Sequence, residues 1–358
     1  MDQDHETTLA KDDRAPSPDD PAKPASPTEI TKRSWKYIFR RAFVEFQNDG
    51  CTDLAAALTY FAVLSIFPGL LAVVSLLGVF GRGQQTTDTL VNFLRDYGPA
   101  SLVQLLADPI RQLTTSTGAG LAFVAGVLGA LWTASGFVGA FGRAMNRIYQ
   151  VTEGRPIWKL RPVNVLVTLV MVIIVVIMLG IVIMSGGVAK AVGDAIGLGA
   201  TTLTVWNIAK WPVLVLLAIT LIGLLYYATP NVRQPKFRWI TPGSAMALLA
   251  MAVAGVAFVF YVSNFSKYNA TYGIIGSVIV MLLGVWLMNN ALLLGAEIDA
   301  EIERGRELQA GIRAEETVQL PPRDTRQSEK KAEKQEALVA AARELRAEHG
   351  GQDAGRES

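Results

Sequence analysis

Residues 272–302 read YGIIGSVIVMLLGVWLMNNALLLGAEIDAEI, and this stretch decides the fold class. A helix rises 1.5 Å per residue, so about 20 apolar residues cross a hydrocarbon core about 30 Å thick. Asn289 and Asn290 lie inside the stretch, and Glu297 and Asp299 lie near its end. Glycine and alanine recur along it, as is typical of membrane helices that pack closely on others. The stretch therefore predicts a membrane helix that packs in a bundle and buries polar groups.

The composition of the whole chain supports a membrane protein. Of its 358 residues, 51% are hydrophobic and only 18% are charged, whereas soluble domains carry about 25% charged residues. The charges gather in the two tails and in short loops, which leaves long apolar runs between them. This pattern is typical of a chain that crosses the membrane several times.

Five further apolar runs are long enough to span a bilayer. They lie at about 53–80, 121–141, 163–184, 204–227 and 242–262. Pro68 and Gly69 predict a kink or a break in the first of them. The predicted fold class is all-α, a polytopic bundle of about six transmembrane helices.

The segment before the first run is both aromatic and basic. Residues 31–50 read TKRSWKYIFRRAFVEFQNDG, with apolar residues every three or four positions and Lys or Arg between them. This spacing predicts an N-terminal amphipathic helix. Such a helix can lie on an anionic leaflet surface or pack against the bundle, and the two positions are compatible.

Three regions follow from these patterns. Residues 1–30 are rich in Asp, Pro and Ser and predict a disordered tail, residues 31–305 form the membrane domain, and residues 306–358 form a polar tail that is partly helical or disordered. Lys and Arg are enriched before the first run, in 141–161, in 229–240 and after the last run. Since such residues stay in the cytoplasm, both termini are expected there.

Few residue types that carry hydrolytic chemistry are present. The chain has 1 cysteine, Cys51, and 2 histidines, both in the polar tails. A metal-dependent hydrolase needs clustered ligands, and a nucleotide-binding loop needs a GxxxxGK[ST] pattern that the chain lacks. We therefore expect no catalytic residues, no metal, no cofactor and no nucleic-acid partner.

Polar residues inside the apolar runs are the candidates for function, because burying them is costly unless they pair or line a cavity. We expect a polar collar at one membrane depth, whose members are Asp53, Tyr60, Arg143, Asn146, Arg147, Asn290, Glu297 and Asp299. One interpretation is a set of interhelical contacts that locks the bundle. The other is a site for an anionic headgroup or a coupling ion at the floor of a cavity.

A second polar group precedes the last run. Asn264, Lys267, Tyr268 and Asn269 lie in the segment SNFSKYNATYG, at the expected outer mouth of the bundle. They predict either a tight polar turn with an interfacial aromatic or a ligand site.

Several segments together resemble the YihY/BrkB family of bacterial inner-membrane proteins, formerly labelled ribonuclease BN. The matching segments are AAALTYFAVLSIFPGLLAVVSLLG from Ala55, GRAMNRIYQVTEGRPIWKLR from Gly142, YYATPNVR from Tyr226, WITPGSAMA from Trp239, NFSKYNATYGIIGSVIVMLLGVWL from Asn264 and LLLGAEIDAEI from Leu292. They cover roughly residues 35–305 in the order of the family.

The resemblance implies a six-helix fold in the bacterial cytoplasmic membrane with cytoplasmic termini. Some members of the family are linked to serum resistance and one to export of a lipid A precursor. The resemblance therefore implies a non-enzymatic protein that binds or transports a lipid-like, amphipathic substrate, with membrane lipids as its partners. The alternative is a structural or scaffolding membrane protein whose tails recruit partners, and a ribonuclease is disfavoured by the missing metal ligands.

Overall fold

The computed structural model describes residues 2–80, 121–184, 200–235, 241–264 and 268–353, and most of these residues are helical. The elements are α1 (Asp2–Arg14), η1 (Pro27–Glu29), α2 (Lys32–Asn48), α3 (Cys51–Phe80), α6 (Leu121–Ile148), α7 (Ile157–Ile183), α9 (Ala200–Ala228), α10 (Pro242–Asn264), α11 (Tyr268–Gln309) and α12 (Arg326–Asp353). Among the described residues, Val232 and Pro322 form an isolated antiparallel β-bridge. The all-α class is confirmed.

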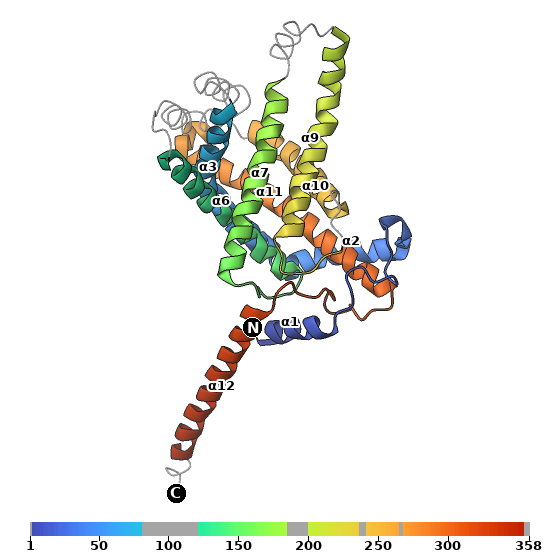
Figure 1. Cartoon of the computed structure of the whole chain (residues 1–358), viewed down its shortest axis with the longest axis vertical. Coiled ribbons are helices and arrows are strands. Elements are labelled where there is room, and N and C mark those ends of the chain that lie inside the picture. Colours follow the sequence, from blue (N-terminus) through green and yellow to red (C-terminus); the bar gives the residue numbers. More distant parts are fainter. Residues whose placement is uncertain (1, 81–120, 185–199, 236–240, 265–267, 354–358) are drawn as a thin grey trace.

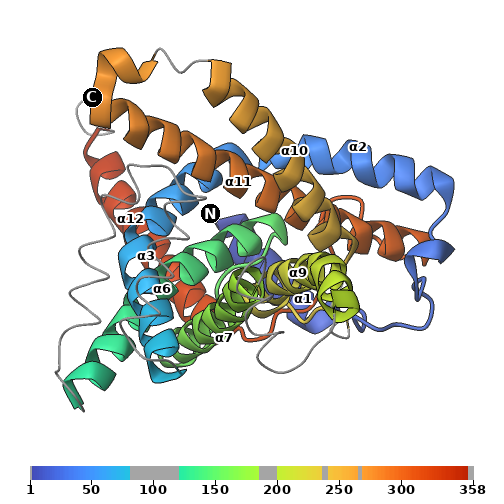
Figure 2. The same cartoon turned by 90° about the horizontal axis from the view of Figure 1, so that it is seen from above.

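Six of these helices pack in a cyclic order, called here the ring, and α6 also contacts α9 and α11 across it (Figure 2). Helix α3 packs on α6, α6 on α7, α7 on α9, α9 on α10, α10 on α11, and α11 returns to α3. Each of these helices therefore packs beside the one that follows it among the described elements, as is usual for consecutive helices of a bundle.

Four of the described helical segments are long and apolar enough to cross a membrane: Ile157–Val182, Thr202–Ala228, Pro242–Ser263 and Val278–Gln309. In α3 the segment Cys51–Ser65 counts as a shorter apolar helix. A multi-pass membrane protein is thus supported, while the count of six stays a prediction. Helix α3 continues through Pro68 and Gly69 without a break. Helix α11 has 42 residues and is about 63 Å long, so it extends well beyond the bilayer core.

The end of the ring that carries both termini is called here the terminal end (Figure 1). The main cluster of buried residues belongs to this end, and its largest members include Leu58, Phe141, Met145, Tyr226 and Leu293. Toward the other end, called the distal end, large apolar side chains are exposed, with Val256 at 73% and Phe260 at 71%. Apolar surface of this kind is suited to contact with lipid tails.

Helix α2 packs along the terminal part of α11. Its Ile38 and Ala42 are buried in one cluster with Ile298 and Ile302, while Phe43 on the other side is 59% exposed. Thr31 caps the helix by accepting a 3.1 Å hydrogen bond from the Ser34 amide. Residues Lys32–Asn48 therefore form a helix, and one side of it packs on the bundle; its amphipathic character and its contact with a leaflet stay predictions.

The tails differ from the sequence-based expectation for residues 1–30. Instead of disorder, the structure has helix α1 and a segment that follows it across the terminal end, with Lys11 and Lys23 both buried. Disorder was predicted because the segment is polar, but its lysines find acceptors on the bundle. At the other terminus, α12 projects away from the bundle (Figure 1).

Candidate functional site

The predicted collar residues of α3 lie on the outside of the ring. Asp53 is exposed, and Tyr60 is 62% exposed. The two residues share a helix face, as their spacing predicts, but this face does not point into the bundle. The aromatic side chain of Tyr60 contacts that of Phe61, the next residue, edge-on, with 5.4 Å between the two aromatic centroids.

The two predicted arginines of α6 are also exposed, and they have different partners. Arg143 Nη1 donates to the Gly139 carbonyl at 3.1 Å. Arg147 Nε lies 3.5 Å from Asp49 Oδ1 in the turn between α2 and α3. Burial raises the pKa of Asp49 to about 6, although Arg147 acts in the opposite direction.

The two predicted carboxylates of α11 contact different helices, and Glu297 is buried while Asp299 is half-buried. Glu297 Oε1 accepts a 3.3 Å hydrogen bond from Cys51 Sγ of α3. Asp299 accepts from Thr241 Oγ1 at 2.6 Å and from the Gly243 amide at 2.7 Å, at the start of α10. The acidic residues thus fasten α11 to α3 on one side and to α10 on the other. The structure does not bring them together with Arg143 or Asp53 in a single ring.

The two asparagines inside α11 have different partners, one on another helix and one on α11 itself. Asn289 Nδ2 donates to Thr59 Oγ1 at 3.2 Å, so a buried polar pair joins α11 and α3. Asn290 Nδ2 donates to the Trp286 carbonyl of its own helix at 2.8 Å. Of the predicted outer-mouth residues, Lys267 lies outside the described residues. Asn264 ends α10, Tyr268 and Asn269 begin α11, and their side chains lie outside the described part as well.

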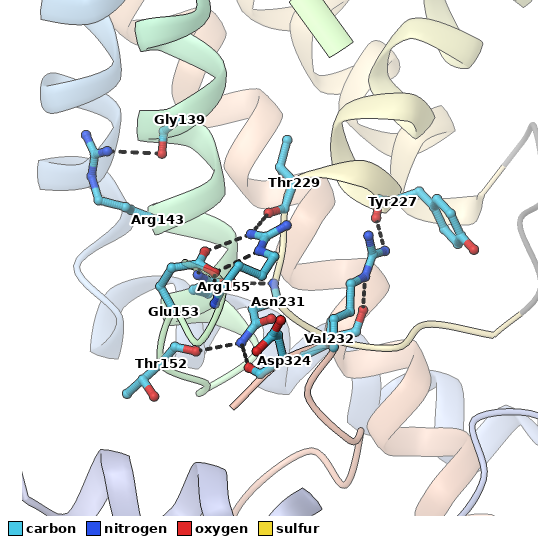
Figure 3. A network of polar contacts seen from close by, with 12 residues as sticks. Gly139, Arg143, Thr152, Glu153, Arg155, Tyr227, Thr229, Asn231, Val232 and Asp324 are labelled. Atoms are coloured by element: carbon cyan, nitrogen blue, oxygen red, sulfur yellow. Dashed lines mark hydrogen bonds and ion pairs between the residues drawn. The ribbon is translucent and has the colours of Figure 1, made fainter. Parts of the chain in front are cut away.

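Asn146 has a role that reaches beyond its own helix (Figure 3). Its side chain is buried, accepts from the Asn231 amide at 2.7 Å and donates to Glu153 Oε2 at 3.0 Å. Glu153 in turn accepts 2.7 Å bonds from Arg155 Nε and Nη2 in a bidentate pair. Arg155 Nη2 also donates to the Thr229 carbonyl at 2.6 Å. The network joins the loop after α6 to the loop after α9.

The segment 312–325 completes this network and packs on the loops at the terminal end of the bundle. Arg323 Nε donates to the Val232 carbonyl at 2.7 Å, and Arg323 Nη2 donates to the Tyr227 carbonyl at 2.5 Å (Figure 3). Asn231 Nδ2 donates to the carbonyls of Thr152 and Asp324, both at 2.9 Å. A Cβ at Gly154 would overlap the Asp324 backbone, since the carbonyl carbon lies 2.6 Å from its position. We call residues 312–325 the C-terminal strap.

Residues 15–30, called here the N-terminal strap, are fastened to α11. Lys23 Nζ lies 2.9 Å from Glu303 Oε1 and 3.4 Å from Glu307 Oε1, and its side chain is fully buried. Arg306 Nε donates to the Pro24 carbonyl at 2.8 Å, and Arg306 also pairs with Glu303. A buried ion pair of this kind holds the segment in place, because breaking it leaves an uncompensated charge.

A cavity of about 380 Å³ lies between the N-terminal strap and the terminal ends of α9, α10 and α11. Tyr226, Tyr227, Thr241 and Asp299 contribute to its wall, together with strap residues from Asp19 to Ile30. The volume is within the usual range for sites that hold one small ligand. Asp299 is the predicted collar residue that reaches this cavity.

Several residues of these networks were not predicted as site residues: Lys23, Asp49, Glu153, Asn231, Glu303 and Arg323. Sequence signals existed for two of them. Asn231 lies in the segment YYATPNVR and Glu153 in VTEGRPIWKLR, both of which carry the family resemblance. The partners of Lys23 and Arg323 are about 280 and 90 residues away along the chain, so spacing could not reveal them.

Within the part of the chain that the structure describes, no group of three or more His, Cys, Asp or Glu side chains is placed to hold a metal ion. The acidic side chains Glu153, Glu297, Asp299 and Glu303 instead accept hydrogen bonds or pair with Arg and Lys. Their arrangement is that of groups which fasten helices and loops to one another.

The family model described as virulence factor BrkB matches residues 42–319. The ribonuclease-like protein YfkH of Bacillus subtilis is 30% identical over 71% of this chain and 90% of its own length. A UPF0761 membrane protein of Alcanivorax borkumensis is 28% identical over 77% of this chain, but the match spans only 62% of that protein, less than two thirds. No solved structure matches. The matched region ends at residue 319, so it includes much of the C-terminal strap.

Proposed function

This chain belongs to the virulence factor BrkB family, and from that premise we propose that it binds and transports an amphipathic, lipid-like substrate. The terminal end would face the cytoplasm, as the Lys and Arg distribution favours, in the cytoplasmic membrane of a bacterium. The observation that carries the proposal is the cavity between α9, α10, α11 and the N-terminal strap.

The wall of the cavity combines the chemistry that an amphipathic molecule needs. Tyr226 and Tyr227 offer aromatic surface, while Thr241 and Asp299 offer a hydroxyl and a carboxylate. The helices next to it pack through glycine, since a Cβ at Gly295 would lie 2.5 Å from the Gly243 carbonyl oxygen. Small residues of this kind let the backbones of neighbouring helices approach closely.

The test is translocation of a fluorescent lipid by the purified protein in proteoliposomes. Gly223 lines the cavity, so Gly223→Leu places a side chain at its wall and is expected to slow translocation at least about tenfold. The matched control is Gly180→Leu, because a Cβ at Gly180 on α7 meets nothing within 4 Å. Equal rates for empty and protein-containing vesicles would contradict the proposal, as would equal losses in the two variants.

A scaffolding role is the second candidate, and helix α12 favours it. This helix projects away from the bundle, and its Leu338 and Leu345 are 61% and 58% exposed (Figure 1). The test must spare the C-terminal strap, so the chain should end after Glu329 rather than lose residues 306–358. If cells carrying this truncation lose the function of the protein while translocation in proteoliposomes persists, the scaffold is supported.

We propose that neither role involves catalysis. The name of the Bacillus subtilis relative describes that protein as ribonuclease-like, so RNA cleavage is the measurement to make. Purified chain is expected to leave precursor tRNA intact. Cleavage that persists through purification and disappears in Asn146→Leu would contradict the proposal.

A further inference from the structure

Two arginines lie close together at the terminal end of the α6–α7 hairpin. Arg143 is about one turn before the end of α6 at Ile148, and Arg161 is about one turn after the start of α7 at Ile157. They are near enough for their like charges to act on one another. Figure 3 shows Arg143 apart from the network of Arg155 and Asn231.

Each guanidinium rests on an aromatic ring. Arg143 Cζ lies 5.3 Å from the centroid of Phe61 on α3, and Arg161 Cζ lies 5.5 Å from the centroid of Trp132 on α6. Trp132 is itself 55% exposed, so this platform is on the outer surface of the ring. Stacking fixes the plane of a guanidinium while leaving the N–H groups at its edge available to accept a ligand oxygen.

Among the residues that the structure describes, these arginines differ from the others near them in having no acidic partner. Arg147 pairs with Asp49, and Arg155 pairs with Glu153. Across the residues that the structure describes, which include all of α6 and α7, no carboxylate lies within 4.0 Å of Arg143 or Arg161. Of the five N–H groups of Arg143, the bond to the Gly139 carbonyl uses one.

Both arginines begin about one helical turn from the terminal ends of their helices, about 5–6 Å along the helix axis. Their guanidinium groups reach farther from these ends, to the Gly139 carbonyl and to the Trp132 ring. Two neighbouring cations without a counter-ion repel one another, and an anion between them removes this repulsion. A phosphate accepts bidentate hydrogen bonds from guanidinium groups particularly well.

We propose that Arg143 and Arg161 bind the phosphodiester of an anionic phospholipid headgroup on the outer surface of α3, α6 and α7. Phe61 and Trp132 hold the two guanidinium groups in position. The site is separate from the cavity beneath the N-terminal strap. Lipid binding at this site can be measured at equilibrium, without translocation. The proposal therefore stands or falls separately from the proposed transport.

The test is native mass spectrometry of the full chain in neutral detergent, titrated with phosphatidylglycerol, phosphatidylcholine and glycerol 3-phosphate. Phosphatidylglycerol is expected to bind in a defined one-to-one complex, at least about tenfold more tightly than the other two. Arg143→Lys with Arg161→Lys keeps the charge but loses the planar fork, and is expected to weaken this binding about tenfold. The matched control Arg233→Lys makes the same change at an exposed position elsewhere on the terminal end and is expected to leave it unchanged.

Three results would overturn the proposal. Equal weakening in Arg233→Lys would show that phosphatidylglycerol responds to overall charge. Equal affinity for phosphatidylcholine would show that the anionic headgroup is not selected. Competition by glycerol 3-phosphate at the same concentrations would show that the site takes soluble phosphate rather than lipid. Melting temperatures of the variants within about 2 °C of the wild type would confirm that they fold, and Arg143→Gln alone provides a second, milder variant.

Discussion

The two ends of the ring differ in what surrounds their side chains. At the terminal end, polar groups such as Asn146, Asn231 and Arg323 are tied together across three segments of chain. At the distal end, the described part of α10 exposes apolar side chains such as Val256 and Phe260. The difference teaches that specific polar contacts hold this bundle at one end, whereas the other end is suited to contact with lipid. Mutations of equal size should therefore have unequal effects.

The largest difference is expected between two glycines on neighbouring helices. In Gly295→Ala the new Cβ would lie 2.5 Å from both the Gly243 carbonyl oxygen and the Ala247 Cβ, which forces α10 and α11 apart. We expect a loss of about 3 kcal/mol in the free energy of unfolding. In Gly255→Ala the Cβ meets nothing within 4 Å, so stability should rise slightly because alanine favours helix. Unfolding in detergent followed by circular dichroism measures both, and equal effects would contradict the comparison.

A smaller loss is expected when the polar network loses one side chain. Asn146→Leu leaves the buried Asn231 amide without its 2.7 Å acceptor and Glu153 without one donor. The expected cost is about 2 kcal/mol. Val256→Ala at the distal end, where the side chain is 73% exposed, should cost less than about 0.5 kcal/mol. The same unfolding assay applies, and a loss from Val256→Ala as large as that from Asn146→Leu would break the contrast.

A mutation in the N-terminal strap is expected to loosen this segment locally, without unfolding the whole bundle. Lys23→Met removes the cation that faces Glu303 and Glu307 and leaves their charges unbalanced. Undocking of the strap should become easier by about 1–2 kcal/mol, which makes proteolysis between residues 14 and 32 about tenfold faster. Lys330→Met on exposed α12 is the control. Unchanged cleavage in Lys23→Met would show that the strap is held by other contacts.

The smallest effect concerns pH. The pKa of Asp49 is raised to about 6 in the folded state, above its unfolded value, so folding favours the protonated form. Its stabilising contribution is fully present below about pH 4 and is lost as pH rises through 6. Wild type should therefore lose about 1 kcal/mol relative to Asp49→Asn between pH 4 and 6.5, because the partly exposed side chain reduces the full effect. Melting temperatures measured against pH provide the check, and parallel curves would contradict the assignment.

Much of this fold could be predicted from sequence, because apolar runs and helical spacing depend on neighbours along the chain. The runs near Val163 and Thr204 correspond to α7 and α9, and the spacing of Trp35, Ile38 and Ala42 predicted α2. The sequence also indicated that Asn146, Glu297 and Asp299 are polar groups needing partners; Asn146 and Glu297 are buried, and Asp299 is half-buried.

The partners themselves could not be predicted, since they depend on three-dimensional contacts. Arg143 and Arg147 are four residues apart, yet Arg147 pairs with Asp49 and Arg143 stacks on Phe61. Arg323 binds backbone carbonyls, which any sequence supplies. Membrane depth alone therefore suggested a single collar. In the structure, Asp53 and Arg143 lie on the outside of the ring, whereas Glu297 contacts α3 and Asp299 contacts the start of α10.

The central claim is that the C-terminal strap is part of the membrane domain whereas α12 is not, and two truncations test it directly. One chain ends after Gly311 and lacks the strap, with its buried Ala314, Val318 and Leu320. The other ends after Glu329 and lacks most of α12. Melting temperature in the same detergent should fall by more than about 10 °C in the first and by less than about 2 °C in the second, because only the first exposes the network of Asn231. Equal melting temperatures for the two truncated chains would contradict the account.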